Sequence, residues 1–153
     1  MKILHFEDNP SDALIIERGI QRQGIPATFI QARGPSEYFA ALQAGGFDVV
    51  LVDNNLPGYS AEDAIVAAKA AYPDVPVIVC SGAALESEVA ASFAAGANDY
   101  VLKDHLWQLS AALRRNIKPP ATVAAPPQAA MMLLVDVVQK LSLARGLDAI
   151  VDI

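Results

Sequence analysis

The chain has 153 residues, of which 54% are hydrophobic and only 18% are charged, so it can bury a sizeable core and is not a disordered tail. A formal net charge of -6 gives it no overall basic field for nucleic acid or anionic lipid, and we expect it to bind neither. A membrane-spanning helix needs about 20 mostly apolar residues in a row, whereas the strongest apolar run, residues 129–135, stops at Asp136. No span is therefore expected.

The first residues of the chain become acidic at Glu7, which is too early for a secretory signal. A single cysteine, Cys80, excludes an internal disulfide and fits a reducing compartment. We therefore expect a cytoplasmic protein.

Short apolar runs then alternate five times with stretches of helical spacing. The predicted strands are residues 2–6, 27–31, 48–52, 75–80 and 99–102. This alternation predicts an α/β fold with a parallel sheet and helices on both faces.

Local start signals accompany the helical stretches. Asn9 followed by Pro10 is typical of an N-cap with proline at the first helical position. Ser60, with Asp63 three residues later, resembles a capping box. The fifth stretch has the clearest apolar stripe, with spacings of three and four: Leu106, Leu109, Leu113 and Ile117.

The character of the sequence changes after Ile117, where a segment with four prolines predicts a semi-rigid extended linker. We place a first domain at residues 1–118, a proline-rich linker at 119–127 and a helical extension at 128–153. Roughly 25 residues cannot bury a core of their own, so we expect the extension to be the truncated start of a following domain.

Polar residues stand at the predicted ends of four strands, and in parallel sheets the functional crevice lies beyond those ends. These residues are Glu7 and Asp8 after the first strand, Asp53 after the third, Ser81 after the fourth and Lys103 after the fifth. Three carboxylates brought to one rim repel one another, which makes sense if a hard divalent cation sits among them.

The same residues suit phosphoryl transfer. Mg²⁺ commonly takes one or two carboxylates plus a phosphate oxygen, and the backbone carbonyl of Asn55 could complete the protein's share. Asp53 can be a nucleophile, because carboxylates form acyl phosphates. Lys103 would balance the charge of the phosphoryl group, and the Ser81 hydroxyl could donate to one of its oxygens.

Four sequence pieces, in this order and at strand ends, resemble the CheY-like receiver domains of two-component signalling. They are Phe-Glu-Asp-Asn at 6–9, Leu-Val-Asp-Asn-Asn-Leu-Pro-Gly at 51–58, Cys-Ser-Gly at 80–82 and Tyr-Val-Leu-Lys at 100–103. The resemblance covers about residues 1–118. It implies a doubly wound (βα)5, flavodoxin-like three-layer sandwich with strand order 2-1-3-4-5.

The resemblance also implies roles for the acidic residues. Asp53 would be the phosphoacceptor, receiving its group from a phosphohistidine on a histidine kinase or phosphotransfer protein. Asp8 and Asp53 would bind Mg²⁺ directly together with the Asn55 carbonyl, and Glu7 would act through a water molecule.

Further roles follow from the same resemblance. Ser81 and Lys103 would contact the phosphoryl group, and Tyr100 would act as a switch residue that responds when Ser81 moves. A homodimer could form through the face made by the fourth helix, fifth strand and fifth helix, or through the C-terminal helix. One departure is Asp104, which stands after Lys103 where the family commonly has proline, often with a cis bond, so the resemblance does not define the local loop geometry.

The tail from residue 134 to 153 resembles the start of a GAF-type sensory domain, so the parent protein could be a hybrid histidine kinase. The fragment itself is expected not to be an enzyme beyond slow self-dephosphorylation. The alternative is a pseudo-receiver that works as a phosphorylation-independent interaction or dimerisation module. A phosphatase resembling the haloacid dehalogenases is disfavoured, because Asn55 stands where those enzymes have a second aspartate.

Overall fold

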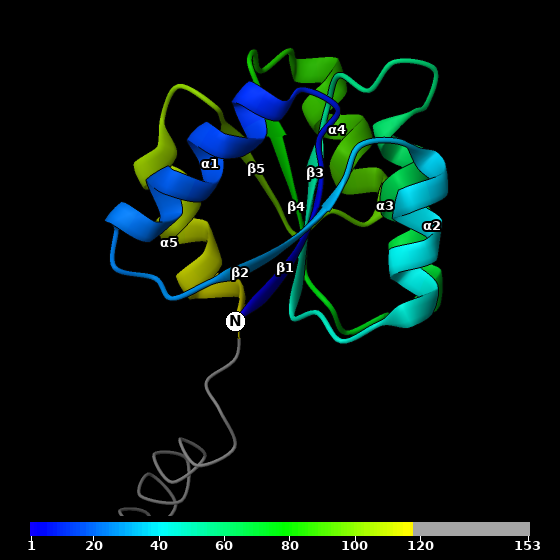
Figure 1. Cartoon of the computed structure of the whole chain (residues 1–153). Coiled ribbons are helices and arrows are strands. Elements are labelled where there is room, and N and C mark those ends of the chain that lie inside the picture. The colour runs from blue at the N-terminus through cyan, green and yellow to red at the C-terminus, as the bar shows by residue number, and fades with distance from the viewer. Residues whose placement is uncertain (118–153) are drawn as a thin grey trace, which may run out of the picture. The chain divides into compact units, whose positions relative to one another are not determined.

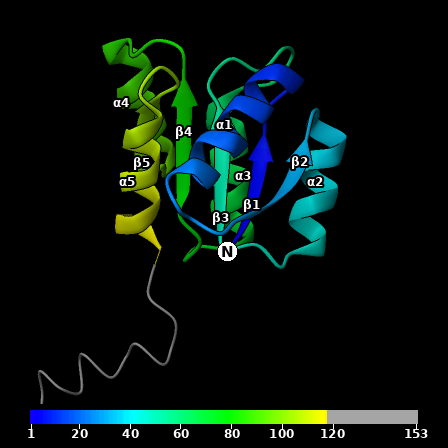
Figure 2. The same cartoon turned by 60° about the vertical axis from the view of Figure 1, so that its left-hand side comes forward.

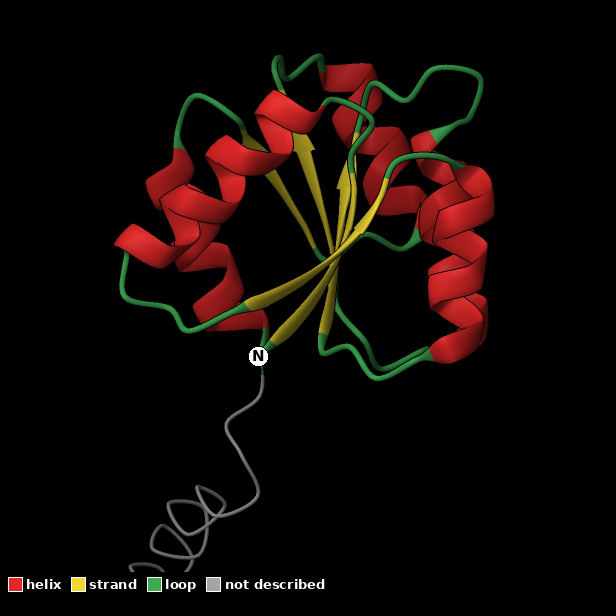
Figure 3. Ribbon diagram, viewed as in Figure 1, coloured by secondary structure: helices red, strands yellow, loops and turns green. Residues whose placement is uncertain are grey.

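The computed structural model describes residues 1–117, in which strands and helices alternate (Figures 1 and 3). The strands are β1 (Lys2–Phe6), β2 (Thr28–Ala32), β3 (Val49–Asp53), β4 (Val77–Ser81) and β5 (Asp99–Leu102). The helices are α1 (Pro10–Arg22), α2 (Pro35–Ala44), α3 (Ala61–Ala71), α4 (Glu86–Ala95) and α5 (Leu106–Asn116).

All neighbouring strands pair in parallel, in the order β2-β1-β3-β4-β5. The helices form a layer on each side of the sheet, with α1 and α5 on one face and α2, α3 and α4 on the other (Figures 1 and 2). The flavodoxin-like fold and the strand order expected from the resemblance are confirmed.

Three strands differ from their predicted bounds by one or two residues. The strand predicted at 75–80 begins only at Val77, because Pro76 has no backbone N–H to donate to the sheet. The strands predicted at 27–31 and 48–52 begin and end one residue later than expected. As a consequence, Asp53 and Ser81 are the last residues of their strands and not the residues that follow them.

Each face of the sheet has its own apolar core. Strands β3 and β4 are buried along their whole length, which explains their continuous apolar runs. On one face, Ile16 and Ile20 of α1 pack with Leu109 and Leu113 of α5. Burying a side chain of this size contributes about 1.5–3 kcal/mol, so these contacts fix α1 and α5 beside each other on the sheet.

Four aromatic rings, which we call the aromatic cluster, dominate the other face near the carboxyl end of β1. Phe6 stacks on Tyr38 at 4.4 Å between ring centroids and lies 5.9 Å from Tyr59. Phe39 closes the cluster at 5.9 Å from Tyr59 and 5.8 Å from Tyr38. The buried Tyr38 hydroxyl also donates to the Ala64 carbonyl at 2.6 Å. The end of β1, helix α2 and the loop after β3 are thereby joined.

The predicted helix caps are present. The Asn9 side chain accepts hydrogen bonds from the backbone N–H groups of Ser11 at 2.9 Å and Asp12 at 3.2 Å. The Ser60 hydroxyl accepts from the Asp63 N–H at 3.0 Å, as in the first half of a capping box. Because these caps are set by local sequence, α1 begins directly after the acidic residues that follow β1.

The predicted linker at 119–127 and the helical extension at 128–153 lie outside the described residues. The C-terminal helix through which a homodimer was expected therefore lies outside them too. Within residues 1–117, no helix has the length and apolar character needed to cross a membrane.

Candidate functional site

Three acidic side chains meet at the carboxyl edge of the sheet. Phe6 pairs with Val52 in the register of β1 and β3, so the residues that follow each of them, Glu7 and Asp53, lie side by side. One carboxylate oxygen from each of Glu7, Asp8 and Asp53 lies within 4.8 Å of the others. The three acids predicted to converge therefore do so.

The acids line a hollow of about 270 Å³. Its walls come from the loops after β1, β3 and β4, the first turn of α1, the last residue of β3 and the residue after β5: Glu7, Asp8, Asn9, Asp12, Asp53, Asn55, Pro57, Gly82 and Lys103.

Lys103 brings a positive charge into this hollow from the end of β5. Its Nζ lies 2.7 Å from Glu7 Oε1, 2.9 Å from Asp12 Oδ2 and 3.2 Å from Asp53 Oδ1. The Lys103 backbone N–H donates to the Ser81 carbonyl at 2.7 Å, which fixes the start of its side chain against β4. One ammonium therefore contacts three carboxylates.

The charge balance of the hollow is visible in the pKa values of its buried groups. Burial raises the pKa of Glu7 to about 7; the hydrogen bond from Lys103 opposes this rise and the neighbouring Asp53 adds to it. Burial would lower the pKa of Lys103, but its bonds to Glu7 and Asp12 outweigh this effect and raise it above the ordinary value. The Lys103 ammonium therefore stays charged, and the carboxylates around it outnumber its single positive charge.

Asn55 belongs to the same hollow. Its backbone N–H donates to Asp53 Oδ1 at 3.3 Å, and the N–H of Asn54 donates to the Cys80 carbonyl at 3.0 Å. The loop after β3 is thus turned back over the Asp53 carboxylate.

Ser81 ends β4 beside the hollow, but its hydroxyl is engaged elsewhere. It donates to the Ala83 carbonyl at 2.6 Å, and the Tyr100 hydroxyl donates to the same carbonyl at 3.2 Å. The two residues expected to act together as a switch are therefore joined through one acceptor. The direction of the Ser81 hydroxyl was not predictable from the sequence.

Two acidic contacts escaped the sequence reasoning. Asp12, in the first turn of α1, gives no local sign of this contact in the sequence, but its carboxylate accepts a hydrogen bond from Lys103 at 2.9 Å. Glu88 on α4 accepts a hydrogen bond from the Asn54 side chain at 3.0 Å. Nothing in the local sequence signals the Glu88 contact, which depends on where α4 docks.

Asp104, which stands where the family commonly has proline, follows Lys103 through a trans peptide bond. The described residues contain no cis peptide bond, and α5 is preceded by His105 as its N-cap residue, without a side-chain cap hydrogen bond. Asp104 is exposed.

Other reactive side chains are poorly placed for chemistry. Burial lowers the pKa of His5 to about 3, followed in effect by the charge of Lys103, and its ring nitrogens have no hydrogen-bond partner among residues 1–117. Burial raises the pKa of the Cys80 thiol to about 12. Both side chains are therefore held in their neutral forms inside the core.

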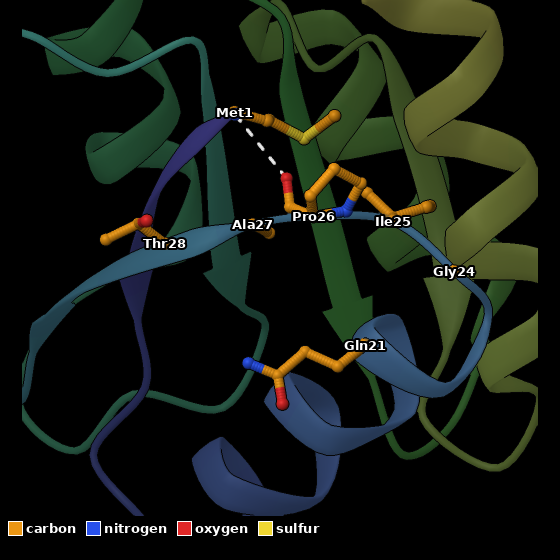
Figure 4. Close-up of a pocket in the computed structure, with 7 residues that line it drawn as sticks. All are labelled: Met1, Gln21, Gly24, Ile25, Pro26, Ala27 and Thr28. Carbon is orange, nitrogen blue, oxygen red and sulfur yellow. Dashed lines mark hydrogen bonds between the residues drawn. The ribbon is translucent and has the colours of Figure 1, made fainter.

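A second, larger hollow of about 660 Å³ lies where β1 and β2 begin, next to the end of α1 (Figure 4). Figure 4 shows Gln21 facing it from α1, and the α-amino group of Met1 lies 3.5 Å from the Pro26 carbonyl. No acidic or basic side chain lines it. The chemistry of the molecule is therefore concentrated at the opposite, carboxyl edge of the sheet.

A family model described as "Response regulator receiver domain" matches residues 3–114, which include the whole acidic hollow. The chain belongs to the response regulator receiver domain family. It is thus a receiver domain of two-component signalling, as the four sequence pieces indicated.

Two curated relatives match a stretch of the chain of similar length. The sensory transduction protein RegX3 of Mycolicibacterium smegmatis is 32% identical over 118 residues, covering 74% of this chain and 50% of RegX3. The chain therefore spans about half the length of the curated relatives that it matches. The expected likeness of residues 134–153 to a GAF domain finds no support in the comparisons.

Solved structures show the same fold. Chemotaxis protein CheY4 of Vibrio cholerae has a TM-score of 0.67 and 22% identity, covering 76% of this chain and 98% of CheY4. The response regulator TrrA of Thermotoga maritima, solved in complex with Mg²⁺-BeF, has a TM-score of 0.66 and 20% identity, with coverage of 76% and 98%.

Proposed function

We propose that this receiver domain accepts a phosphoryl group on Asp53 from the phosphohistidine of a histidine kinase or phosphotransfer protein. The observation that carries the proposal is the position of Asp53 at the end of β3. Its carboxylate lies 3.2 Å from the Lys103 ammonium and within 4.8 Å of Glu7 and Asp8. A nucleophile, a cation and two further acids thus share one small hollow.

The transfer itself is a displacement at phosphorus. An Asp53 oxygen forms a bond to phosphorus while the bond between phosphorus and the imidazole nitrogen breaks, and the electron pair leaves with the imidazole. Lys103 keeps its proton, because its pKa is raised, and donates a hydrogen bond to the phosphoryl group in place of Asp53. The backbone N–H of Asn55, now on Asp53 Oδ1, offers a second donor.

The acidic cluster fits a magnesium ion. All three side chains offer carboxylate oxygens, the donors that Mg²⁺ prefers. In this proposal Asp8, Asp53 and the Asn55 carbonyl hold the ion and Glu7 acts through water, while the ion, when bound, neutralises the phosphoryl oxygens. The structural neighbour TrrA was solved with Mg²⁺-BeF, which supports the choice of metal.

Ser81 and Tyr100 supply the response to phosphorylation in this proposal. Ser81 gives up its 2.6 Å bond to the Ala83 carbonyl and turns to a phosphoryl oxygen. The Tyr100 hydroxyl then remains the side-chain donor on that carbonyl, so the loop after β4 and the Tyr100 ring readjust together.

Helices α4 and α5 present apolar side chains that suit contact with another protein or a second copy of the chain. These exposed side chains are Leu85, just before α4, at 58%, Phe93 at 46% and Trp107 at 62% exposure. We propose that the fragment transmits a signal through these helices and is not itself an enzyme beyond slow loss of its phosphoryl group.

Intact-mass measurement after incubation with acetyl phosphate and Mg²⁺ tests the proposal. The wild-type chain should gain the mass of one phosphoryl group, Asp53→Asn should gain none, and the exposed control Asp74→Asn should behave as wild type. Equal masses for wild type and Asp53→Asn would contradict the proposal. An unlabelled wild type that also fails to bind Mg²⁺ would favour the pseudo-receiver alternative.

A further inference from the structure

We propose that Asp12 is a positioning residue of this site. Together with Glu7 it holds the Lys103 ammonium 3.2 Å from the Asp53 carboxylate, so that in the reaction one N–H is left for the incoming phosphoryl group. This inference rests on the proposed phosphoacceptor function of Asp53.

The three carboxylates around the Lys103 ammonium lie at different distances from it. An ammonium has three hydrogens, and Lys103 has three carboxylate oxygens within reach. The contacts to Glu7 and Asp12, at 2.7 and 2.9 Å, have the length of strong charge-assisted hydrogen bonds. The contact to Asp53, at 3.2 Å, is the longest. It is an ion pair without hydrogen-bond geometry, so Glu7 and Asp12 take two of the ammonium N–H groups and the third is left for a phosphoryl oxygen.

Glu7 and Asp12 hold the ammonium from different sides. The Glu7 side chain is fully buried, whereas that of Asp12 is 39% exposed at the mouth of the hollow. With Glu7 alone, the four-carbon stem of Lys103, itself 17% exposed, could swing its charge toward solvent. The hydrogen bond to Asp12 at the mouth of the hollow opposes this movement.

The backbone of Asp12 is itself fixed. Its N–H donates to the Asn9 side chain at 3.2 Å in the first turn of α1. A carboxylate in this turn also faces the positive end of the helix dipole. The hydrogen-bonded cap thus places the Asp12 side chain where the Lys103 ammonium meets it.

The rate of phosphorylation distinguishes two effects of Asp12: positioning of the Lys103 ammonium, and general repulsion of the anionic phosphodonor. Acetyl phosphate is an anion, so loss of a negative charge alone should speed labelling. If Asp12 positions Lys103, Asp12→Ala should instead lower the maximal labelling rate about two- to fivefold, the upper part of the range for a partly exposed ion pair. The half-saturating donor concentration should change less than about twofold, because the positioned donor acts mainly in the transition state.

Two further variants complete this experiment. Asp12→Glu, which keeps a carboxylate, should recover most of the rate. Glu17→Ala, which removes another carboxylate from α1 that makes no ion pair with Lys103, should match wild type. A labelling rate in Asp12→Ala equal to or above that of wild type would overturn the inference.

A second measurement does not depend on phosphoryl transfer. In ¹H–¹⁵N NMR spectra recorded for lysine side chains, the Lys103 ammonium, assigned from Lys103→Arg, should be protected from exchange in wild type and Glu17→Ala and lose protection in Asp12→Ala. An unchanged signal in Asp12→Ala would refute the positioning role. Suppose that the Lys103 signal is protected in wild type and loses protection in Asp12→Ala, but that the wild type is never labelled by acetyl phosphate. The phosphoacceptor function then fails, while the placement of Lys103 by Asp12 stands.

Discussion

Magnesium should stabilise the folded chain, because folding gathers carboxylates that the unfolded chain disperses. Within residues 1–117, one cluster of acids, Glu7, Asp8 and Asp53, has the geometry to hold an ion. For one such site, each tenfold rise in free Mg²⁺ above the dissociation constant adds about 1.4 kcal/mol to the free energy of unfolding. In a domain of this size that corresponds to a rise of about 4–6 °C in Tm.

Thermal unfolding followed by circular dichroism measures this effect. Mg²⁺ should be varied over several decades at constant ionic strength, so that general screening of surface charge stays the same. Wild type and the exposed control Asp74→Asn should show the same rise in Tm with the logarithm of Mg²⁺ concentration. Asp8→Asn should show a flat response. The reasoning is refuted if Asp8→Asn keeps the wild-type slope, or if the wild type has none.

Two predictions concern the core. Tyr38→Phe removes the buried 2.6 Å hydrogen bond to the Ala64 carbonyl and should lower the free energy of unfolding in urea by about 1 kcal/mol; an unchanged midpoint would contradict this. The Cys80 thiol should not react with a thiol reagent at pH 8 in the folded protein, because burial raises its pKa to about 12. Its labelling should follow urea unfolding, and immediate labelling of native protein would show that the site is open.

The sequence predicted those features that local pattern and topology determine. Asn9 and Ser60 could be identified as caps because their partners lie two or three residues away. The proximity of Glu7, Asp8 and Asp53 was predictable, because parallel strands in the expected order have their carboxyl ends at one edge of the sheet.

What escaped prediction depends on how separate elements dock. The contact between Asp12 and Lys103 joins residues 91 positions apart and requires α1 to lie beside the end of β5. The bond between Asn54 and Glu88 likewise depends on the placement of α4. The Ser81 hydroxyl can rotate between several acceptors, and only the surrounding loop decides which of them it bonds.

The aromatic cluster has a mechanical consequence for the site. Phe6 precedes Glu7 in the chain and Tyr59 lies in the loop after Asp53, so the acidic half of the hollow rests on interlocked rings that resist displacement. The other side of the hollow, at Ser81 and Tyr100, combines packing with rotatable polar groups: Tyr100 packs against the same apolar core, and both hydroxyls bond the Ala83 carbonyl. A rearrangement that starts at Asp53 should therefore change these hydroxyl bonds while the aromatic cluster stays in place.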